Sequence, residues 1–152
     1  MVYALHEYLN EFFETQATNG LTKSVYHDLN QPFLVGEAKA VAVLSKTIMK
    51  PYWAMLEDKS VDYVEMGEHF RKMLAFLEDA AQEPEMLLDG RSSFPEKYVR
   101  KDAWWWAVFK SHEVYDPIAL TSLGIVVPSL ILLFRTHLKE FLSGGEMATI
   151  SS

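Results

Sequence analysis

The chain has 152 residues, with 14 Lys and Arg against 21 Asp and Glu, which gives a formal net charge of −7. This length fits one domain. The acidic total argues against direct binding to a nucleic-acid backbone, because such binding needs Lys and Arg to displace counterions. The sequence contains no cysteine, which excludes disulfides, thiolate metal sites and cysteine nucleophiles.

The first third of the chain has apolar residues at helical spacing. This spacing predicts a helix from Val2 to about Thr18, ended by Asn19-Gly20. A short helix is expected from Thr22 to Leu29, with Thr22 as its cap. Pro32 is placed to begin a helix that runs to Lys50, and Pro51 is expected to break or kink it.

The rest of the chain continues this pattern. Ser60 is a good N-cap for the next amphipathic helix. Residues 90–95 form a loop in this interpretation, and another helix is expected from Glu96 to Phe109. Asp116-Pro117 is typical of a helix start, with Asp as the cap, and the last helix is expected to run to about Leu142.

These patterns predict an all-α fold. Few segments alternate polar and apolar residues with period two, so we expect a single-domain bundle of about five to seven helices over residues 1–142. Residues 143–152 are expected to form a disordered tail after a stop signal at Gly144-Gly145. Glu7 and Glu11 interrupt the apolar run that a secretory signal needs, which favours an intracellular location. An alternative interpretation is that the chain is a segment of a longer protein.

Residues 117–134 carry no charge, and this stretch has two interpretations. Its 18 residues lie at the lower edge of the length that spans a membrane, and Arg135, His137 and Lys139 follow it. Polar and small residues and Pro128 dilute its apolarity, however. We therefore favour a core helix of a soluble bundle over a membrane span.

The run Trp104-Trp105-Trp106 is the most unusual feature of the sequence. Consecutive helical residues point about 100° apart, so three in a row cannot all face one core. Exposed tryptophans are common anchors at interfaces, so Trp104, Trp105, Trp106 and also Trp53 are predicted partner-binding residues. In the alternative, two indoles belong to the core and the third lies against a neighbouring loop.

Acidic residues gather between Glu57 and Asp89. This segment holds ten Asp and Glu against three Lys and Arg, a local sum of 3 − 10 = −7. The acidic face that we single out is formed by Glu57, Asp58, Asp62, Glu65 and Glu68. Such a face either steers a basic partner or simply keeps the surface soluble.

A metal site has only weak candidates, Glu65, Glu68 and His69. Glu65 and His69 are four residues apart and share a helix face, as in part of a di-iron or zinc site. A complete site needs a second such pair, and none of His6-Glu7, His27-Asp28 and His112-Glu113 repeats that spacing. We therefore predict a solvated helix face and no cofactor. No Gly-x-Ser-x-Gly elbow and no phosphate-binding glycine loop occur either.

The stretch from Lys39 to Glu146 resembles a set of uncharacterised animal open reading frames found in mobile-element-like contexts. The similarity is carried by Lys50-Pro51-Tyr52-Trp53, Leu56-Glu57, Lys101-Asp102-Ala103 and Leu142-Ser143-Gly144-Gly145, together with Leu44. Those relatives typically have Gly-Pro before the Trp and a Leu-Pro-Gly-Gly ending, from which Lys50 and Ser143 depart. The resemblance implies no activity, and raises the expectation of a segment of a larger polypeptide.

The leading hypothesis is a non-enzymatic helical module for protein–protein interaction. Its partner is expected to be another protein or a second copy of this chain, because symmetric dimers are the commonest oligomers. The alternatives are a metal-assisted enzyme that uses the Glu and His residues above, and a single-pass membrane-anchored protein.

Overall fold

The computed structural model describes residues 2–16 and 19–142, and every regular element in them is helical. The fold is therefore all-α and forms a single domain, as predicted. The α-helices are α1 (Val2–Gln16), α2 (Gly20–Leu29), α3 (Pro32–Leu44), α4 (Lys50–Glu57), α5 (Tyr63–Gln82), α6 (Glu85–Leu88), α7 (Ala103–Phe109) and α8 (Tyr115–His137). The predicted tail at 143–152 and the Gly144-Gly145 stop lie outside the described residues.

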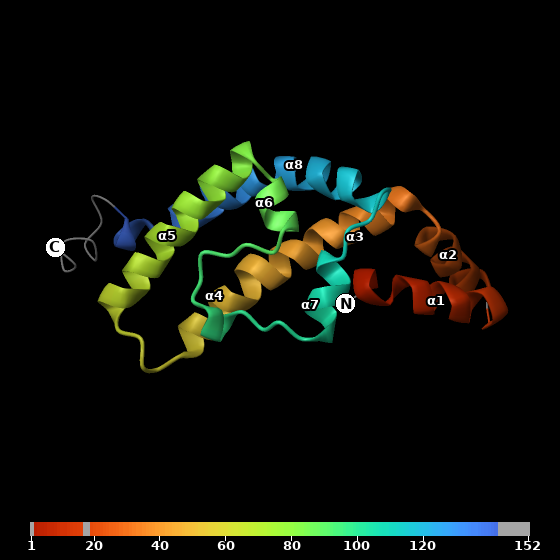
Figure 1. The fold of residues 1–152 in the computed structure, drawn as a ribbon, viewed down its shortest axis with the longest axis horizontal. Coiled ribbons are helices and arrows are strands. Elements are labelled where there is room, and N and C mark those ends of the chain that lie inside the picture. Colours follow the sequence, from red (N-terminus) through yellow and green to blue (C-terminus); the bar gives the residue numbers. More distant parts are fainter. Residues whose placement is uncertain (1, 17–18, 143–152) are drawn as a thin grey trace.

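A long helical rod runs through the middle of the molecule (Figure 1). It consists of α3, the π-helical turn η1 (Ser45–Met49) and α4. The prediction that Pro51 breaks this helix is wrong, because helical structure continues through the proline to Glu57. The regular α-helix is interrupted only by the π turn just before it. Pro51 has no N–H to offer the Thr47 carbonyl one turn earlier. The Ser92 hydroxyl donates to that carbonyl instead, at 2.6 Å.

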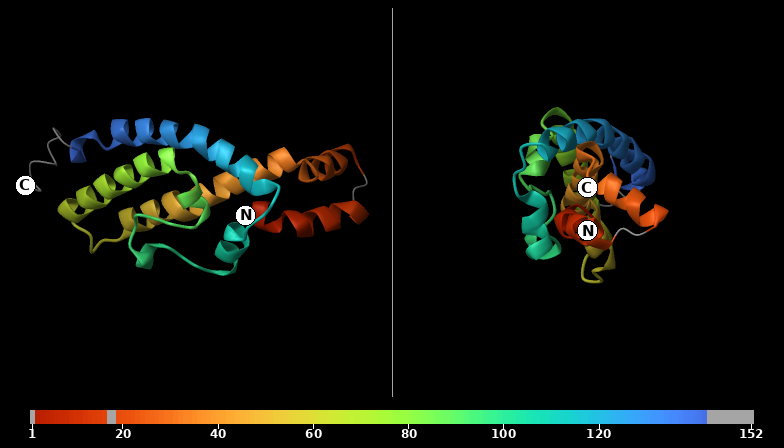
Figure 2. Two further views of the ribbon diagram at one scale, coloured as in Figure 1. Left: turned by 45° about the horizontal axis from the view of Figure 1, so that its top comes forward. Right: turned by 90° about the vertical axis from the view of Figure 1, so that its right-hand side faces the viewer.

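α8 and α5 cover one side of the rod, as the left view of Figure 2 shows. The centre of the core consists of fully buried side chains from these elements, namely Val43, Ile48, Met55, Phe70, Met73, Leu77, Leu123 and Val127. α3 and α8 approach closely at Gly36, where an added Cβ would lie 2.5 Å from the Ile118 Cβ. The absence of a side chain at Gly36 therefore allows the two helices to pack.

α1 and α2 form a hairpin at one end of the molecule (Figure 1). Few of its side chains are buried, namely Tyr3 in α1 and Leu29 in α2. The prediction of Thr22 as a cap, and of Asn19-Gly20 as the end of the first helix, is wrong. Asn19 is instead the N-cap of α2 and accepts a hydrogen bond from the Thr22 N–H at 2.9 Å.

Two other predicted helix starts are also displaced. Asp62, not Ser60, caps α5, and its side chain accepts the Glu65 N–H at 2.9 Å in a capping box. Ser60 lies before this cap, in a turn where its N–H and its hydroxyl both donate to Asp58. α8 begins at Tyr115, so Asp116 lies within its first turn rather than at its cap.

Two predicted helix extents are too long. The segment predicted as one helix over 96–109 contains only the 3₁₀ turn η2 (Glu96–Tyr98) and the short helix α7. Asp102 separates them, because its side chain caps α7 and its own backbone is extended. α8 ends at His137 rather than near Leu142, and the 3₁₀ turn η3 (Lys139–Phe141) follows.

Candidate functional site

Asp102 fixes the position of the tryptophan-bearing helix α7. Its carboxylate accepts a hydrogen bond from the backbone N–H of Trp105 at 3.0 Å. It also lies 3.5 Å from the Lys46 ammonium and 3.3 Å from the Arg100 guanidinium. The hydrogen bond from Trp105 lowers the pKa of Asp102, and the charge of Lys46 acts in the same direction. Because Lys46 belongs to the π turn, this contact holds the start of α7 against the central rod.

The three consecutive tryptophans lie in different environments. Trp105 is only 4% exposed, and its ring lies 4.2 Å from that of Phe109, centre to centre. It packs against Gly90, whose φ of +79° favours glycine and where an added Cβ would come within 2.8 Å of the indole. Trp104 and Trp106 are 38% and 66% exposed. The prediction that they cannot all face the core is confirmed, while partner binding by any of them stays a prediction.

Trp104 forms one wall of a groove of about 490 Å³ between α1, α3 and α7. The other described residues that line it are Val2, Tyr3, Ala4, Ala38, Val41, Ala42, Ser45, Lys46, Lys50 and Val108. Most of these are apolar, and the two lysines come from the π turn and the start of α4. The groove is thus an apolar channel with positive charge among its lining residues.

A second cavity of about 210 Å³ adjoins this groove. Val2, Tyr3 and Ala38 line both of them. The remaining lining residues come from α1, α2 and α3 and include Val25, Leu29, Leu34 and Val35. Together the two cavities follow the surface of α3 beneath the N-terminal end of α1.

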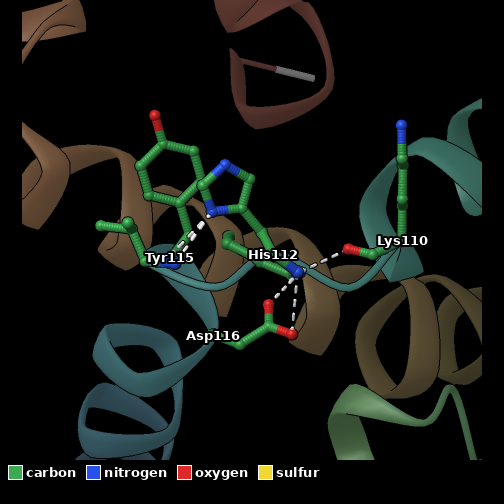
Figure 3. A network of polar contacts seen from close by, with 6 residues as sticks. Lys110, His112, Tyr115 and Asp116 are labelled. Atoms are coloured by element: carbon green, nitrogen blue, oxygen red, sulfur yellow. Dashed lines mark hydrogen bonds and ion pairs between the residues drawn. The ribbon is translucent and has the colours of Figure 1, made fainter.

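A buried ion pair lies beneath the same end of α1. Lys39 is 1% exposed, and its ammonium donates to the Lys110 carbonyl at 2.9 Å and pairs with the Asp116 carboxylate. Asp116 also accepts the His112 N–H at 3.2 Å, and His112 Nδ1 accepts the Tyr115 N–H at 3.2 Å (Figure 3). This network joins α3 to the connection between α7 and α8.

Tyr3 covers this ion pair from α1. The Lys39 ammonium lies 5.2 Å from the centre of the Tyr3 ring, within cation–π range. Burial raises the pKa of the Tyr3 hydroxyl, and the charge of Asp116 adds to this effect. The sequence reasoning did not identify this network. A lysine surrounded by apolar residues on α3 was the available signal, but its partner lies 77 positions further along the chain.

The predicted acidic residues lie around the connection between α4 and α5. Glu57, Asp62, Glu65 and Glu68 are exposed, although Asp62 and Glu65 also form the capping box of α5. Asp58 accepts hydrogen bonds from the Ser60 and Tyr98 hydroxyls, each at 2.6 Å, and these bonds lower the pKa of its carboxyl. Asp58 therefore has a structural role in addition to its charge.

The predicted metal candidates do not converge on one point. In the part of the chain that the structure describes, no group of three or more His, Asp or Glu side chains is placed to hold a metal ion. Glu65 is engaged at the N-terminus of α5, while partial burial lowers the pKa of His69. The geometry adds nothing in favour of a metal-assisted enzyme, which stays an untested alternative.

The outer face of α8 is apolar and open. This helix is long and apolar enough to cross a membrane by length and composition, and only 28% of its most apolar 18-residue window is buried. Its inner face is buried at regular spacing, as in a core helix, through Ala119, Leu123, Val127, Ile131 and Phe134. Ile125, Val126, Leu132 and Leu133 are exposed on its other side.

Searches with this chain against known protein families, curated proteins and solved structures found no match. Any functional assignment therefore depends on the geometry of the chain itself.

Proposed function

We propose that this protein is a non-enzymatic helical module for protein–protein interaction, anchored by Trp106 of α7. The observation that carries the proposal is the contrast within α7, where Trp105 is locked in the core while Trp106 presents most of its indole to solvent. An exposed indole on a fixed helix offers a large apolar contact at a low entropic cost, and tryptophan is enriched among the residues that dominate binding energy.

The two exposed indoles of α7 have different surroundings. Trp104 and Trp106 are two positions apart, which is about 200° around the helix axis, so their side chains point in nearly opposite directions. Trp104 lines the groove against α3, and Trp106 is directed away from that groove. A partner that packs on the free side of α7 would therefore meet Trp106 first.

The acidic residues near α5 support a partner of opposite charge. Glu57, Asp62, Glu65 and Glu68 are exposed in a protein whose formal charge is −7. Charges of one sign at a surface accelerate encounter with a basic partner and lose this effect at high salt. A foreign partner should therefore be basic and bind more slowly as salt is raised, whereas this charge would oppose a second copy of the chain.

Substitution of Trp106 by Ala tests the proposal. We expect the free energy of unfolding to change by no more than about 0.5 kcal/mol, because the side chain is exposed. Association should weaken, measured as self-association by analytical ultracentrifugation and as retention of basic proteins in a pull-down. Tyr8→Ala is the matched control, since Tyr8 is an exposed aromatic residue on α1. The proposal is wrong if Trp106→Ala and Tyr8→Ala associate as the unaltered protein does.

A second candidate function is membrane association through the outer face of α8. The exposure of Ile125, Val126, Leu132 and Leu133 on one helix favours it. Co-sedimentation with phosphatidylcholine vesicles should then be lost when Ile125 and Leu132 are both changed to Ser. If the unaltered protein stays in the supernatant with such vesicles, this candidate is excluded.

A further inference from the structure

We propose that the groove beside Trp104 binds a free fatty acid, with the acyl chain along α3 and the carboxylate at Lys46 and Lys50. This site is separate from the proposed protein contact, because Trp106 does not line the groove. Nothing in the sequence analysis pointed to it.

The floor of the groove is shaped by small residues. Ala38, Ala42 and Ser45 follow one another at spacings of four and three, so they share one face of the central rod. Because their side chains are short, space remains above them between two walls. One wall is the start of α1 with Val2 and Tyr3, and the other consists of Trp104 and Val108 from α7. The result is a concave groove of about 490 Å³ rather than a flat apolar patch.

The size of the channel fits one small amphiphile. The groove measures about 490 Å³ and the adjoining cavity about 210 Å³, and ligand pockets in proteins are typically about 300–1,000 Å³. The shared residues Val2, Tyr3 and Ala38 place the second cavity next to the first. The two cavities succeed each other along α3, so a linear chain longer than the groove would extend toward the second cavity, whose lining also includes His6 and Asp28.

The lysines identify the charge of the head group. Among the described residues, no carboxylate oxygen lies within 4.0 Å of the Lys50 ammonium. Lys46 lies 3.5 Å from the Asp102 carboxylate and keeps this contact, which holds α7 against the central rod. Lys50 is thus available to an anion, and Lys46 lines the same groove without leaving Asp102. A carboxylate head group complements both the charge and the apolar floor.

Titration of the full chain with monomeric saturated fatty acids, from octanoate to palmitate, tests this proposal. Quenching of tryptophan fluorescence reports binding, with Trp104→Phe to show that the signal arises in the groove. Each added methylene should tighten binding about fourfold until the channel is filled, because burial of one such group is worth about 0.8 kcal/mol. Primary alcohols of equal chain length serve as uncharged controls and should bind at least about tenfold more weakly.

Two variants separate the head-group contact from the channel. Lys50→Gln should weaken the binding of fatty acids about tenfold and leave the alcohols unchanged. Lys59→Gln is the matched control, because Lys59 is exposed and does not line the groove. Ser45→Leu should block binding of acids and alcohols alike by filling the floor, and circular dichroism checks that this variant remains helical.

Three results would overturn the proposal. The first is that no acid of the series from octanoate to palmitate binds to the unaltered protein. The second is that acids and alcohols of equal length bind equally well, since the lysines would then play no part. The third is binding to phosphatidylcholine vesicles without binding to monomeric fatty acid, which would assign the apolar surface to a bilayer instead.

Discussion

The two ends of this molecule differ in how many side chains their helices bury. α5 buries six residues, including Phe70, Met73 and Leu77, and α8 buries five along its inner face. The hairpin helices α1 and α2 have 15 and 10 residues, against 20 and 23 in α5 and α8, and bury only Tyr3 and Leu29. Phe12 and Leu21 of this hairpin are left largely exposed.

This difference separates the part that stabilises the domain from the part that forms its cavities. Burial of apolar surface is the main favourable term in folding, so α3, α5 and α8 supply most of the stability. The hairpin has few buried contacts and should open locally at a lower free energy than the rest. It nevertheless provides walls of both cavities through Val2 and Tyr3. A loosely held wall is suited to admitting a ligand.

The largest effect is expected at the buried ion pair, where the two regions meet. Asp116→Ala leaves the Lys39 ammonium buried with only the Lys110 carbonyl as a hydrogen-bond acceptor among the described residues. Removal of one partner of a buried pair typically costs about 3–5 kcal/mol, and we expect the lower end because Asp116 is partly exposed. Urea unfolding at neutral pH measures this loss.

A double variant shows whether the cost arises from the orphaned charge. Lys39→Met combined with Asp116→Ala removes both charges, so most of the lost stability should return. If Asp116→Ala alone changes the free energy of unfolding by less than about 1 kcal/mol, the ion pair does not stabilise the contact between α3 and the start of α8.

The next largest effect is expected where α3 and α8 touch. Gly36→Ala places a Cβ against the Ile118 side chain close to its backbone, so the helices must separate, which costs about 1–3 kcal/mol. Gly124→Ala on the outer face of α8 is the matched control, because nothing lies within 4 Å of its added Cβ. That variant should gain up to about 1 kcal/mol from helix propensity. Equal effects in thermal unfolding would mean that α8 does not pack on α3 at Gly36.

The sequence predicted those features that depend on local spacing. The all-α fold, the helix start at Pro32 and the divergence of the three tryptophans follow from periodicity and helix geometry alone. Ser60 and Asp62 are both good caps by residue type, and in the structure Asp62 caps α5 while Ser60 donates hydrogen bonds to Asp58. Local rules cannot rank two such neighbours.

The features that the sequence did not predict depend on distant residues. The Thr47 carbonyl, to which Pro51 offers no N–H, accepts its hydrogen bond from the Ser92 hydroxyl, 45 positions away. The groove likewise needs α1, α3 and α7 to converge, so Lys46 and Lys50 could not be assigned to a site from their spacing. The exposed tryptophans could be predicted because three consecutive tryptophans in one helix cannot all face the core, and this is visible in the local sequence alone.

A smaller effect, which depends on pH, is expected at Asp58 beside α5. Its hydrogen bonds hold the folded-state pKa below the ordinary aspartate value, so the stabilisation is complete above that value and is lost as pH falls below about 4. Asp58→Asn should therefore lower the urea midpoint at neutral pH, and the gap to the unaltered protein should narrow on acidification. Tyr98→Phe, which removes one donor, should reproduce part of this change. A gap that widens towards low pH would contradict the assignment.

The smallest effect is expected in the hairpin. Phe12→Ser and Leu21→Ser should each change the free energy of unfolding by no more than about 0.5 kcal/mol, because both side chains are largely exposed. Leu29→Ala is the contrasting variant, since Leu29 is buried where α2 meets α3. Hydrogen exchange should show faster opening of α1 and α2 than of α5 in the unaltered protein. If the Ser variants destabilise the whole domain as strongly as Leu29→Ala does, the hairpin belongs to the cooperative core. The start of α1 would then not open separately to admit a ligand to the groove.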